Sequence, residues 1–304
     1  MTPAPSDSIV RCPVCNSQDA GFAIKVKDYS VSGEYFNVFE CPQCSLRFTK
    51  DAPPGEKMGV YYESEDYISH SNTRKGIVNN LYHVVRRHTL ASKCQLIKKY
   101  TGLKSGHHLD IGAGTGAFVQ YMNEHEWQST GVEPDEKACA LALTHHNTQL
   151  LPAEALDSFS CGSFDAISMW HVLEHVHNLY PYLDHVKKIL KPGGIVFIAV
   201  PNYTSYDALK YGPQWAAYDV PRHLYHFSPA SMKWLLNAAG FQLTQEVPMW
   251  WDSFYISLLS EKYAGSNAYV VKGFLTGLLS NLKTMANKEK CSSLIYVAKS
   301  EKND

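Results

Sequence analysis

Three closely spaced glycines follow an apolar stretch and stand directly before a segment with helical periodicity. They are Gly112, Gly114 and Gly116, with Ala113 between the first two. Glycine lets the backbone turn tightly and lets a ligand approach it closely, and the N–H groups at a helix start bind polar ligands. The pattern predicts a strand, a cofactor-binding turn and a helix. Gly112, Gly114 and Ala117 also satisfy the GxGxxG/A pattern of dinucleotide-binding folds, so a nicotinamide or flavin enzyme is an alternative here.

Two acidic residues accompany this turn. Asp110 lies at the end of the preceding strand, where its carboxylate suits a ligand with a cationic ammonium and would repel a pyrophosphate. Glu133 ends the next predicted strand, 23 residues after Asp110, where a carboxylate can accept hydrogen bonds from both hydroxyls of a ribose. S-adenosylmethionine carries an ammonium and a ribose. Asp110 therefore favours S-adenosylmethionine over a dinucleotide, whereas Glu133 fits either cofactor.

Strand-like and helix-like segments alternate from residue 107 to residue 298. Such alternation predicts an α/β fold with a parallel, doubly wound sheet of seven strands and helices on both faces. Ligands in this architecture bind beyond the carboxyl ends of the strands, so the loops after the first five strands are expected to form the cleft. The expected strands are 107–111, 128–133, 148–151, 164–169, 194–200, 241–247 and 293–298, and the expected helices are 116–126, 135–145, 178–190 and 229–239.

Helical periodicity also occurs outside this alternation. Residues 74–100 form an amphipathic pattern that ends at Thr101-Gly102 and predicts a leading helix. Residues 249–290 predict two further helices. The second of them has an apolar stripe that we expect to pack on the core rather than on a membrane or a partner, because apolar helical faces are usually buried. The stripe consists of Val271, Phe274, Leu275, Leu278, Leu279 and Leu282.

Four of the eight cysteines form two CxxC pairs, Cys12 with Cys15 and Cys41 with Cys44, separated by 25 residues. This spacing matches a four-thiolate zinc ribbon, in which a closed coordination shell makes the Zn²⁺ structural. Zinc would supply folding energy that a module of this size lacks. A redox dithiol is the alternative, but it leaves the second pair without a role.

The punctuation Asp51–Gly55 marks the end of the cysteine module. The sequence therefore predicts a zinc-ribbon module over residues 1–52 and a linker with the leading helix over 53–100. The cofactor-binding domain is expected over 101–304, with a helical insertion at about 249–290.

Beyond the glycine turn, three further segments occur in order. Leu151–Glu154, Ser163–Val176 and Leu190–Asn202 resemble the third, fourth and fifth strand motifs of the class I S-adenosylmethionine-dependent methyltransferases. With the turn, the resemblance covers about residues 75–300. It implies a Rossmann-like methyltransferase sheet and S-adenosylmethionine as the cofactor.

The resemblance also implies further cofactor residues. Ala153 and Glu154 correspond to the segment that meets the adenine, and Trp170 and His171 to positions that line the cofactor or substrate side. Many family members place Asp or Asn just before the Ala-Glu pair, whereas this chain has Leu151-Pro152. The adenine contacts are therefore expected to be mostly backbone and apolar.

Histidine suits proton removal from an acceptor near neutral pH. His171 follows the fourth strand, and His223 lies between the fifth strand and the next helix, where the family builds acceptor pockets. We expect His171 as a candidate base, His223 as a base or as a group that orients the acceptor, and Arg222 as an anion contact. The alternative is that His223 and His226 brace their loop. The aromatic residues between Pro201 and Pro221 either stack on an acceptor or cover a hydrophobic core.

The function expected from these features is S-adenosylmethionine-dependent methyl transfer to a small molecule or a glycan or cell-envelope precursor. Alternatives are an RNA methyltransferase that uses the zinc ribbon for substrate binding and a non-catalytic cofactor-binding module. Lys plus Arg total 28 against 29 Asp plus Glu, so the balance provides no broad positive field for nucleic acid. The sequence has neither a signal-peptide layout nor eighteen consecutive apolar residues, which predicts a cytoplasmic protein without a membrane span. The acceptor atom and the oligomeric state stay open.

Overall fold

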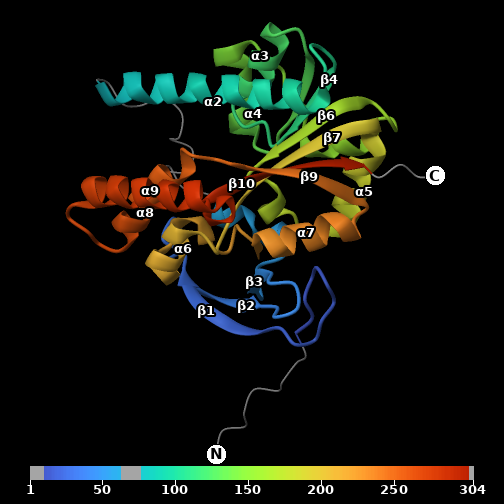
Figure 1. Cartoon of the computed structure of the whole chain (residues 1–304). Helices are drawn as coiled ribbons and strands as arrows, with labels where there is room; N and C mark the ends of the chain where they lie inside the picture. Colours follow the sequence, from blue (N-terminus) through green and yellow to red (C-terminus); the bar gives the residue numbers. More distant parts are fainter. Residues whose placement is uncertain (1–9, 63–76, 301–304) are drawn as a thin grey trace, which may run out of the picture. The chain divides into compact units, whose positions relative to one another are not determined.

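The structure, a computed structural model, describes residues 10–62 and 77–300, in which the side chains of 77–86 are not described. The chain divides into two compact units, each made of several chain segments (Figure 1). The unit called here the cofactor unit contains the glycine turn, and the unit called the cysteine unit contains the four paired cysteines. Among the described residues, the cofactor unit comprises 77–200, 236–247 and 294–300, and the cysteine unit comprises 10–62, 201–235 and 248–293.

The cofactor unit is built on a sheet of strand order β5-β4-β6-β7-β10-β9. Strand β4 pairs in parallel with both β5 and β6, and β6 pairs in parallel with β7. On the outer side of β5, Val132 forms a single parallel bridge to Leu151. The predicted α/β sheet is confirmed, although its expected strand at 148–151 is reduced to this one bridge. The strands are β4 (His107–Ile111), β5 (Gln128–Val132), β6 (Phe164–Trp170), β7 (Leu190–Pro201), β9 (Phe241–Pro248) and β10 (Ser293–Ser300).

Helices α2, α3 and α4 lie on one side of this sheet and α5 lies on the other (Figure 1). Helix α2 ends where Gly102 adopts a φ of +71°, as the sequence predicted; the expected positions 74–76 fall outside the described residues. The Asp135 side chain caps α4 by accepting from the backbone N–H of Lys137. The bounds are α2 (Ile77–Thr101), α3 (Ala117–Glu124), α4 (Glu136–His146), α5 (Leu179–Ile189), and the short helices η3 (Ala153–Ser158) and η4 (Leu173–His175).

The cysteine unit contains an antiparallel sheet of strand order β1-β2-β3-β8. Strand β8 comes from far along the chain, because Arg47 pairs with His226 and Phe48 with Tyr225. Helix α7 follows β8, and Ser228 caps it by accepting from the backbone N–H of Ser231. The bounds are β1 (Gly21–Lys27), β2 (Tyr35–Glu40), β3 (Arg47–Lys50), β8 (Tyr225–His226), α7 (Pro229–Ala238), η1 (Gly55–Lys57) and η2 (Gly59–Tyr61).

The aromatic segment after Pro201 forms the core of the cysteine unit. Its buried rings pack with Val26 and Val38 of the sheet and with Ile256. The sequence left two interpretations of this segment, stacking on an acceptor or covering a hydrophobic core. The structure supports the second. The buried aromatic residues are Tyr203, Tyr211, Trp215 and Tyr218.

Helices α8 and α9 pack against each other and against α6. The prediction that the apolar stripe of the last helix packs on the core is wrong, because its six side chains are between 42% and 63% exposed. Small residues take the buried positions instead, since a Cβ at Gly273 would lie 2.6 Å from the Cα of Leu258. No described helix is long and apolar enough to cross a membrane. The bounds are α6 (Tyr206–Tyr211), α8 (Asp252–Tyr263), α9 (Tyr269–Ala286), η5 (Gly212–Gln214), η6 (Ala216–Tyr218) and η7 (Lys288–Lys290).

Candidate cofactor site and cysteine cluster

The glycine turn connects β4 to α3 through three left-handed backbone positions. The φ angles are +72° at Gly112, +54° at Gly114 and +72° at Gly116. Residues other than glycine adopt such values only at a cost in conformational energy. A Cβ at Gly112 would lie 2.4 Å from Cγ2 of Val172, and one at Gly116 would lie 2.9 Å from Cβ of Ala142. Beside Gly114 nothing lies within 4 Å. Packing therefore requires the first and third glycines, whereas the middle one borders open space.

The turn is held against β5. The backbone N–H groups of Gly112 and Ala113 both donate to the carbonyl of Val132, at 2.8 and 3.1 Å. The carboxylate of Glu133, the next residue, accepts from the N–H of Gly114 at 2.7 Å through Oε2 and from the N–H of Asp135 at 3.0 Å through Oε1. Burial raises the pKa of Glu133, and these two backbone hydrogen bonds oppose the rise. Each oxygen keeps a lone pair that can accept from a ribose hydroxyl.

Asp110 is buried at the carboxyl end of β4, with 2% of its surface exposed. It stands opposite Ser168 in the parallel register of β4 and β6, and the Ser168 hydroxyl donates to Asp110 Oδ1 at 2.5 Å. Burial raises the pKa of Asp110 to about 6, while the Ser168 bond and the ammonium of Lys93 act in the opposite direction. A buried carboxylate with this cost of ionisation gains from a cationic ligand.

A chain of hydrogen bonds leads to Asp110 across three neighbouring strands. His108 Nε2 lies 2.9 Å from the Ser168 hydroxyl, and its Nδ1 lies 2.8 Å from that of Ser129. Because the Ser168 proton goes to Asp110, the Ser168 oxygen accepts from His108 Nε2–H, and Nδ1 therefore accepts from Ser129. Full burial lowers the pKa of His108 to about 3, so the imidazole is neutral. These residues orient Asp110, and the sequence pattern did not identify them.

Lys93 of α2 is a second residue that the sequence pattern missed. Its Nζ lies 4.1 Å from the centroid of the Trp170 ring and 5.6 Å from that of Phe118, distances typical of cation–π contacts. Trp170, predicted as a cofactor residue, stands at the end of β6, and its ring meets that of Phe118 edge to face at 5.8 Å. The signal available in the sequence was its position between the apolar residues Ala91 and Cys94 of the predicted leading helix.

Ala153 and Glu154 begin η3 next to the edge of the sheet, and both are exposed. The backbone of Leu151 is already used, because it accepts from Glu133 N–H and donates to the Gly131 carbonyl, each at 2.9 Å. Backbone contacts to an adenine are therefore expected from residue 153 onward. This placement brings the predicted adenine segment beside the predicted ribose ligand.

His171 follows β6 in a left-handed conformation with a φ of +58°. A non-glycine residue adopts this conformation only where its surroundings impose it, and here the backbone N–H of His171 donates to Ala199 O at 2.9 Å. Its imidazole is 34% exposed, and Nδ1 lies 3.3 Å from Oε1 of the fully buried Glu174. A partly accessible imidazole within ion-pair distance of a buried carboxylate is suited to act as a general base.

His223 belongs to the cysteine unit and is 8% exposed. Its Nδ1 lies 2.9 Å from the carbonyl of Ala217, while its own carbonyl accepts from the Thr49 hydroxyl at 2.8 Å. The Thr49 oxygen also lies 3.1 Å from Nε2 of His226, whose pKa burial lowers well below its usual value. These contacts tie the loop to β3, as the bracing alternative expects.

Arg222 does not have the role of an anion contact for an acceptor. Its guanidinium is fully buried, donating to Asp28 Oδ1 at 2.9 Å, to Asp219 Oδ1 at 2.7 Å and to the Tyr61 carbonyl at 2.7 Å. Burial opposes the charged form, but the bonds and charges of Asp219 and Asp28 raise the pKa of Arg222. The Arg222 guanidinium therefore joins three segments of the cysteine unit. This role could not be predicted from the neighbouring sequence.

The four paired cysteines come together in the cysteine unit. Their Sγ atoms all lie within 4.8 Å of one another, with 3.5 Å between Cys12 and Cys44 and 3.4 Å between Cys15 and Cys41. Tetrahedral zinc with Zn–S bonds of about 2.3 Å places its sulfurs about 3.8 Å apart. The sulfur positions fit such an ion.

The two CxxC turns have the same backbone geometry. The N–H of Asn16 donates to the carbonyl of Cys12 at 3.0 Å, and that of Ser45 donates to Cys41 at 2.9 Å. Asn16 and Ser45 both have a left-handed φ, of +60° and +57°. Two matching CxxC turns with their thiols close together are typical of a four-cysteine metal site.

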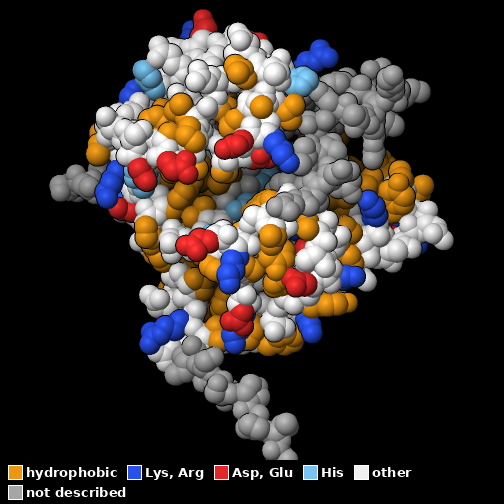
Figure 2. Space-filling model, turned by 180° about the vertical axis from the view of Figure 1, so that it is seen from behind, with side chains coloured by type: hydrophobic (Ala, Val, Ile, Leu, Met, Phe, Trp, Pro, Cys, Tyr) orange, Lys and Arg blue, Asp and Glu red, His pale blue; other side chains and the backbone are white. Residues whose placement is uncertain are grey.

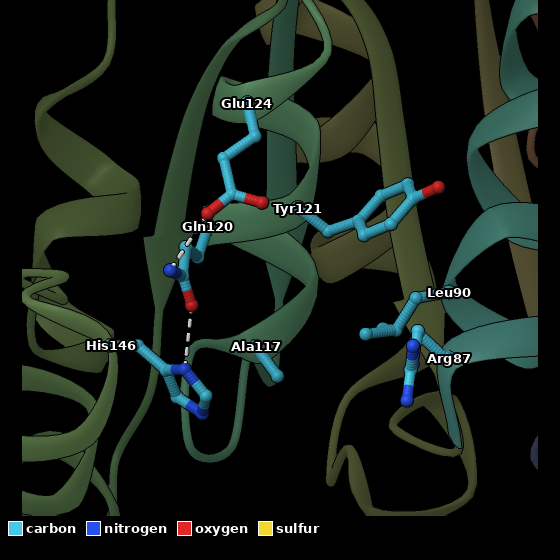
Figure 3. A pocket seen from close by; sticks show the side chains of 7 residues that line it. All are labelled: Arg87, Leu90, Ala117, Gln120, Tyr121, Glu124 and His146. Carbon is cyan, nitrogen blue, oxygen red and sulfur yellow. Dashed lines mark hydrogen bonds between the residues drawn. The ribbon is translucent and has the colours of Figure 1, made fainter. Parts of the chain in front are cut away.

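A separate hollow of about 260 Å³ lies beside α3 in the cofactor unit, where side chains of α2, α3 and α4 line it (Figure 3). The Gln120 side chain bridges His146 and Glu124 there, at 2.6 and 2.8 Å. None of the predicted cofactor residues lines this hollow. It is lined by Arg87, Leu90, Ala117, Gln120, Tyr121, Glu124 and His146.

Lys, Arg, Asp and Glu side chains are interspersed on the described part of the face in Figure 2. The formal net charge of the chain is −1. Interspersed charges do not make the broad field of one sign that nonspecific binding to nucleic acid uses.

A parallel α/β sheet with Asp110 and Glu133 at the carboxyl ends of neighbouring strands defines a protein that binds a nucleoside cofactor. A family model described as a methyltransferase domain matches residues 85–246, more than half of the chain, and the chain belongs to this family. The methyltransferase family expected from the sequence motifs is thereby confirmed.

Curated relatives include two proteins named ubiquinone biosynthesis O-methyltransferase. The one from Caulobacter vibrioides is 36% identical over 103 residues, which cover 32% of this chain and 41% of the relative. The one from Maricaulis maris is 29% identical over 152 residues, which cover 46% of this chain and 60% of the relative. The chain thus spans about half the length of these relatives. Among solved structures, 1,6-didemethyltoxoflavin-N1-methyltransferase of Burkholderia thailandensis aligns with 91% of this chain and 100% of its own, at 15% identity and a TM-score of 0.49.

Proposed function

We propose that this chain transfers the methyl group of S-adenosylmethionine to a small-molecule acceptor. The observation that carries the proposal is the position of two carboxylates at one glycine turn: Glu133 accepts from the N–H of Gly114 within the turn, and the buried Asp110 lies two residues before Gly112. When bound, the cofactor supplies a methyl group activated by its sulfonium. Membership of the methyltransferase family and the names of the relatives support the same reaction.

In this proposal the residues of the chain bind the cofactor and orient it for methyl transfer. Asp110 holds the ammonium of the cofactor, and Glu133 accepts from the ribose hydroxyls while it keeps the glycine turn closed. Trp170 and the backbone around Ala153 give the apolar and backbone contacts to the purine. In-line displacement gains most of its rate from such alignment and from exclusion of water.

An oxygen acceptor needs its proton removed, and we infer that His171 takes it. The support is its partly exposed imidazole beside the buried Glu174. His223 is proposed only to orient an acceptor, because its ring is largely buried and its Nδ1 lies within hydrogen-bond distance of the Ala217 carbonyl. A hydroxyl of a small molecule, with glycan or cell-envelope precursors as one class, is the proposed acceptor.

The test incubates the protein with methyl-labelled S-adenosylmethionine and pools of small metabolites and glycan precursors, followed by mass spectrometry. One labelled small-molecule product is expected. His171→Ala should lower kcat by about 10²- to 10⁴-fold and leave cofactor affinity intact, whereas exposed His145→Ala should change neither. A His171→Ala variant with the full rate and the same pH profile would remove the histidine from the mechanism. Label that goes to RNA alone would replace the acceptor class.

We also propose that Cys12, Cys15, Cys41 and Cys44 hold one structural Zn²⁺, on the support of their sulfur distances and paired turns. Zinc would stabilise the β1-β2-β3-β8 sheet, because Cys41 and Cys44 lie between β2 and β3 and the ion would join them to Cys12 and Cys15. Elemental analysis should find about one zinc per chain. Replacing Cys41 and Cys44 with serine should remove it, and Cys161→Ser, at an exposed cysteine, should not. Equal zinc in both variants would refute the site.

A further inference from the structure

Helix α9 has its large apolar side chains outside and its small side chains inside. The residues named here the apolar face of α9 are exposed by between 42% and 75%. Its buried positions are Gly273, Thr276, Gly277, Ser280 and Thr284. The apolar face consists of Val271, Phe274, Leu275, Leu278, Leu282 and Met285.

Tight packing fixes this orientation. A Cβ at Gly277 would lie 2.8 Å from the Cα of Phe254 on α8, so the two helices touch through their backbones. The Ser253 hydroxyl lies 3.0 Å from the Asn281 side chain across the same contact, and the Ser280 hydroxyl donates to Asp207 at 2.8 Å. Rotating α9 to bury its leucines would break these contacts. The apolar face is therefore the outer face of the folded unit.

The apolar face forms one continuous stripe. Its residues recur at three- and four-residue intervals, which places them on one side of a helix. Helix α9 has 18 residues and is therefore about 27 Å long. Figure 2 shows hydrophobic side chains gathered on the side where Figure 1, turned by 180°, places α8 and α9. Stripes of this size on a soluble protein mark an interaction surface.

The charges beside the stripe indicate what covers it. Lys272 and Lys283 are the charged residues of α9, and both are exposed. They are eleven positions apart, so they lie along the same edge of the stripe. On α8, Glu261 is buried and accepts from the Tyr211 hydroxyl at 3.1 Å. Asp252 of α8 is half-buried and Lys262 is exposed, so the exposed charged residues of the two helices are Lys262, Lys272 and Lys283. A partner that is apolar and negatively charged complements this surface.

Aromatic residues flank the hairpin. Trp250 and Trp251 precede α8, Tyr255 lies in α8 and Tyr269 begins α9, and these four side chains are between 39% and 47% exposed. Trp and Tyr with exposed rings are enriched where protein meets the head-group region of a bilayer. A second copy of α9 would bring lysines toward lysines with no acid of α9 to pair them, which disfavours self-association.

We propose that the apolar face of α9 docks on an anionic lipid bilayer, with the helix lying in the plane of the head groups. The apolar side chains enter the acyl boundary, and the two lysines remain at the level of the lipid phosphates. This docking is independent of the proposed methyl transfer, so either can fail alone.

The test measures co-sedimentation of the full chain with vesicles of equal parts phosphatidylcholine and phosphatidylglycerol, and with vesicles of phosphatidylcholine alone. We expect binding to the first and weak binding to the second. Leu278→Glu combined with Phe274→Glu should weaken binding by about a hundredfold, because two apolar anchors are lost and two charges oppose insertion. Lys272→Ala and Lys283→Ala should each weaken it by about fivefold on anionic vesicles.

Leu143→Glu is the matched control, because Leu143 is a 56% exposed leucine on α4. It should bind vesicles like the unchanged protein. All substituted positions are exposed, so circular dichroism should be unaltered in each variant. Equal binding of the double variant and the control would overturn the proposal. Sedimentation of a dimer that dissociates in Leu278→Glu, without vesicle binding, would overturn it in favour of a second copy.

Discussion

The hydroxyl of Ser168 donates a 2.5 Å hydrogen bond to the carboxylate of Asp110, its partner in the parallel register of β6 and β4. The proposed anchor of the cofactor ammonium is thus fixed by the sheet and not by a loop. His108 continues the chain of bonds on the other side of Ser168. Affinity for the cofactor should therefore depend on residues that never touch it.

Ser168→Ala tests this dependence. The bond from Ser168 lowers the pKa of Asp110, so its removal should raise that pKa above about 6 and disfavour the ionised form that attracts an ammonium. Affinity for S-adenosylmethionine should fall about tenfold at neutral pH, and its loss on acidification should begin at a higher pH. Calorimetric titration over a pH series measures both. Ser163→Ala, which removes a hydroxyl bonded to the Ser160 carbonyl, should behave like the unchanged protein; identical pH curves for all three would contradict the role of Ser168.

Asp110→Asn should stabilise the cofactor-free protein while it abolishes binding. Burial raises the folded-state pKa of Asp110 from 3.8 to about 6. The free energy of unfolding of the unchanged protein therefore falls as the pH rises from about 4 to about 6, and it stays lower above that range. Two units of pKa correspond to about 3 kcal/mol. Urea unfolding should show Asp110→Asn more stable by about 2–3 kcal/mol at neutral pH and by almost nothing near pH 4. Equal stability at both pH values would contradict the burial argument.

Gly112→Ala and Gly114→Ala should distinguish the effect of a glycine on protein stability from its effect on cofactor binding. At Gly112 the new Cβ would lie 2.4 Å from Val172, whereas at Gly114 it would meet nothing within 4 Å. Gly112→Ala should therefore cost about 3 kcal/mol or more of unfolding free energy, and Gly114→Ala about 1–2 kcal/mol from its φ alone. Gly114→Ala should still weaken cofactor binding, since its Cβ enters the open space beside the turn. Denaturant unfolding and calorimetry on both variants check this, and equal destabilisation would speak against it.

Arg222→Leu should act on stability. It would leave Asp28 buried without its ion pair, which costs about 3–5 kcal/mol. Arg87→Leu, at an exposed arginine of α2, is the control and should stay within about 0.5 kcal/mol. Thermal and urea unfolding measure the difference. A stable Arg222→Leu variant with impaired turnover would restore the arginine as an acceptor contact.

Short sequence patterns were sufficient to predict the first strands and helices of the cofactor unit. The glycine turn and the alternation of segments predicted β4 to α4 to within a few residues, because these signals depend on residues that are close together in the sequence. The strand expected at 148–151 ended at one bridge from Leu151, since Pro152 cannot donate a further ladder bond.

Features that depend on distant pairing could not be predicted. Ser168 meets Asp110 only because β6 pairs beside β4 in one register. Periodicity showed that α9 has an apolar stripe but not which face packs, and its glycines and serines made the contact with α8. The cysteine unit joins β3 to β8 over more than 170 positions, which no window of sequence reveals.

Asp110 and Glu133 are proposed to bind S-adenosylmethionine at the glycine turn. Isothermal titration of the zinc-loaded full chain with S-adenosylmethionine at neutral pH tests this proposal most directly. We predict saturable binding of one molecule per chain, lost in Asp110→Ala and in Glu133→Ala and kept in Leu143→Glu. Absence of binding to the folded protein, or undiminished binding by both alanine variants, would contradict the account.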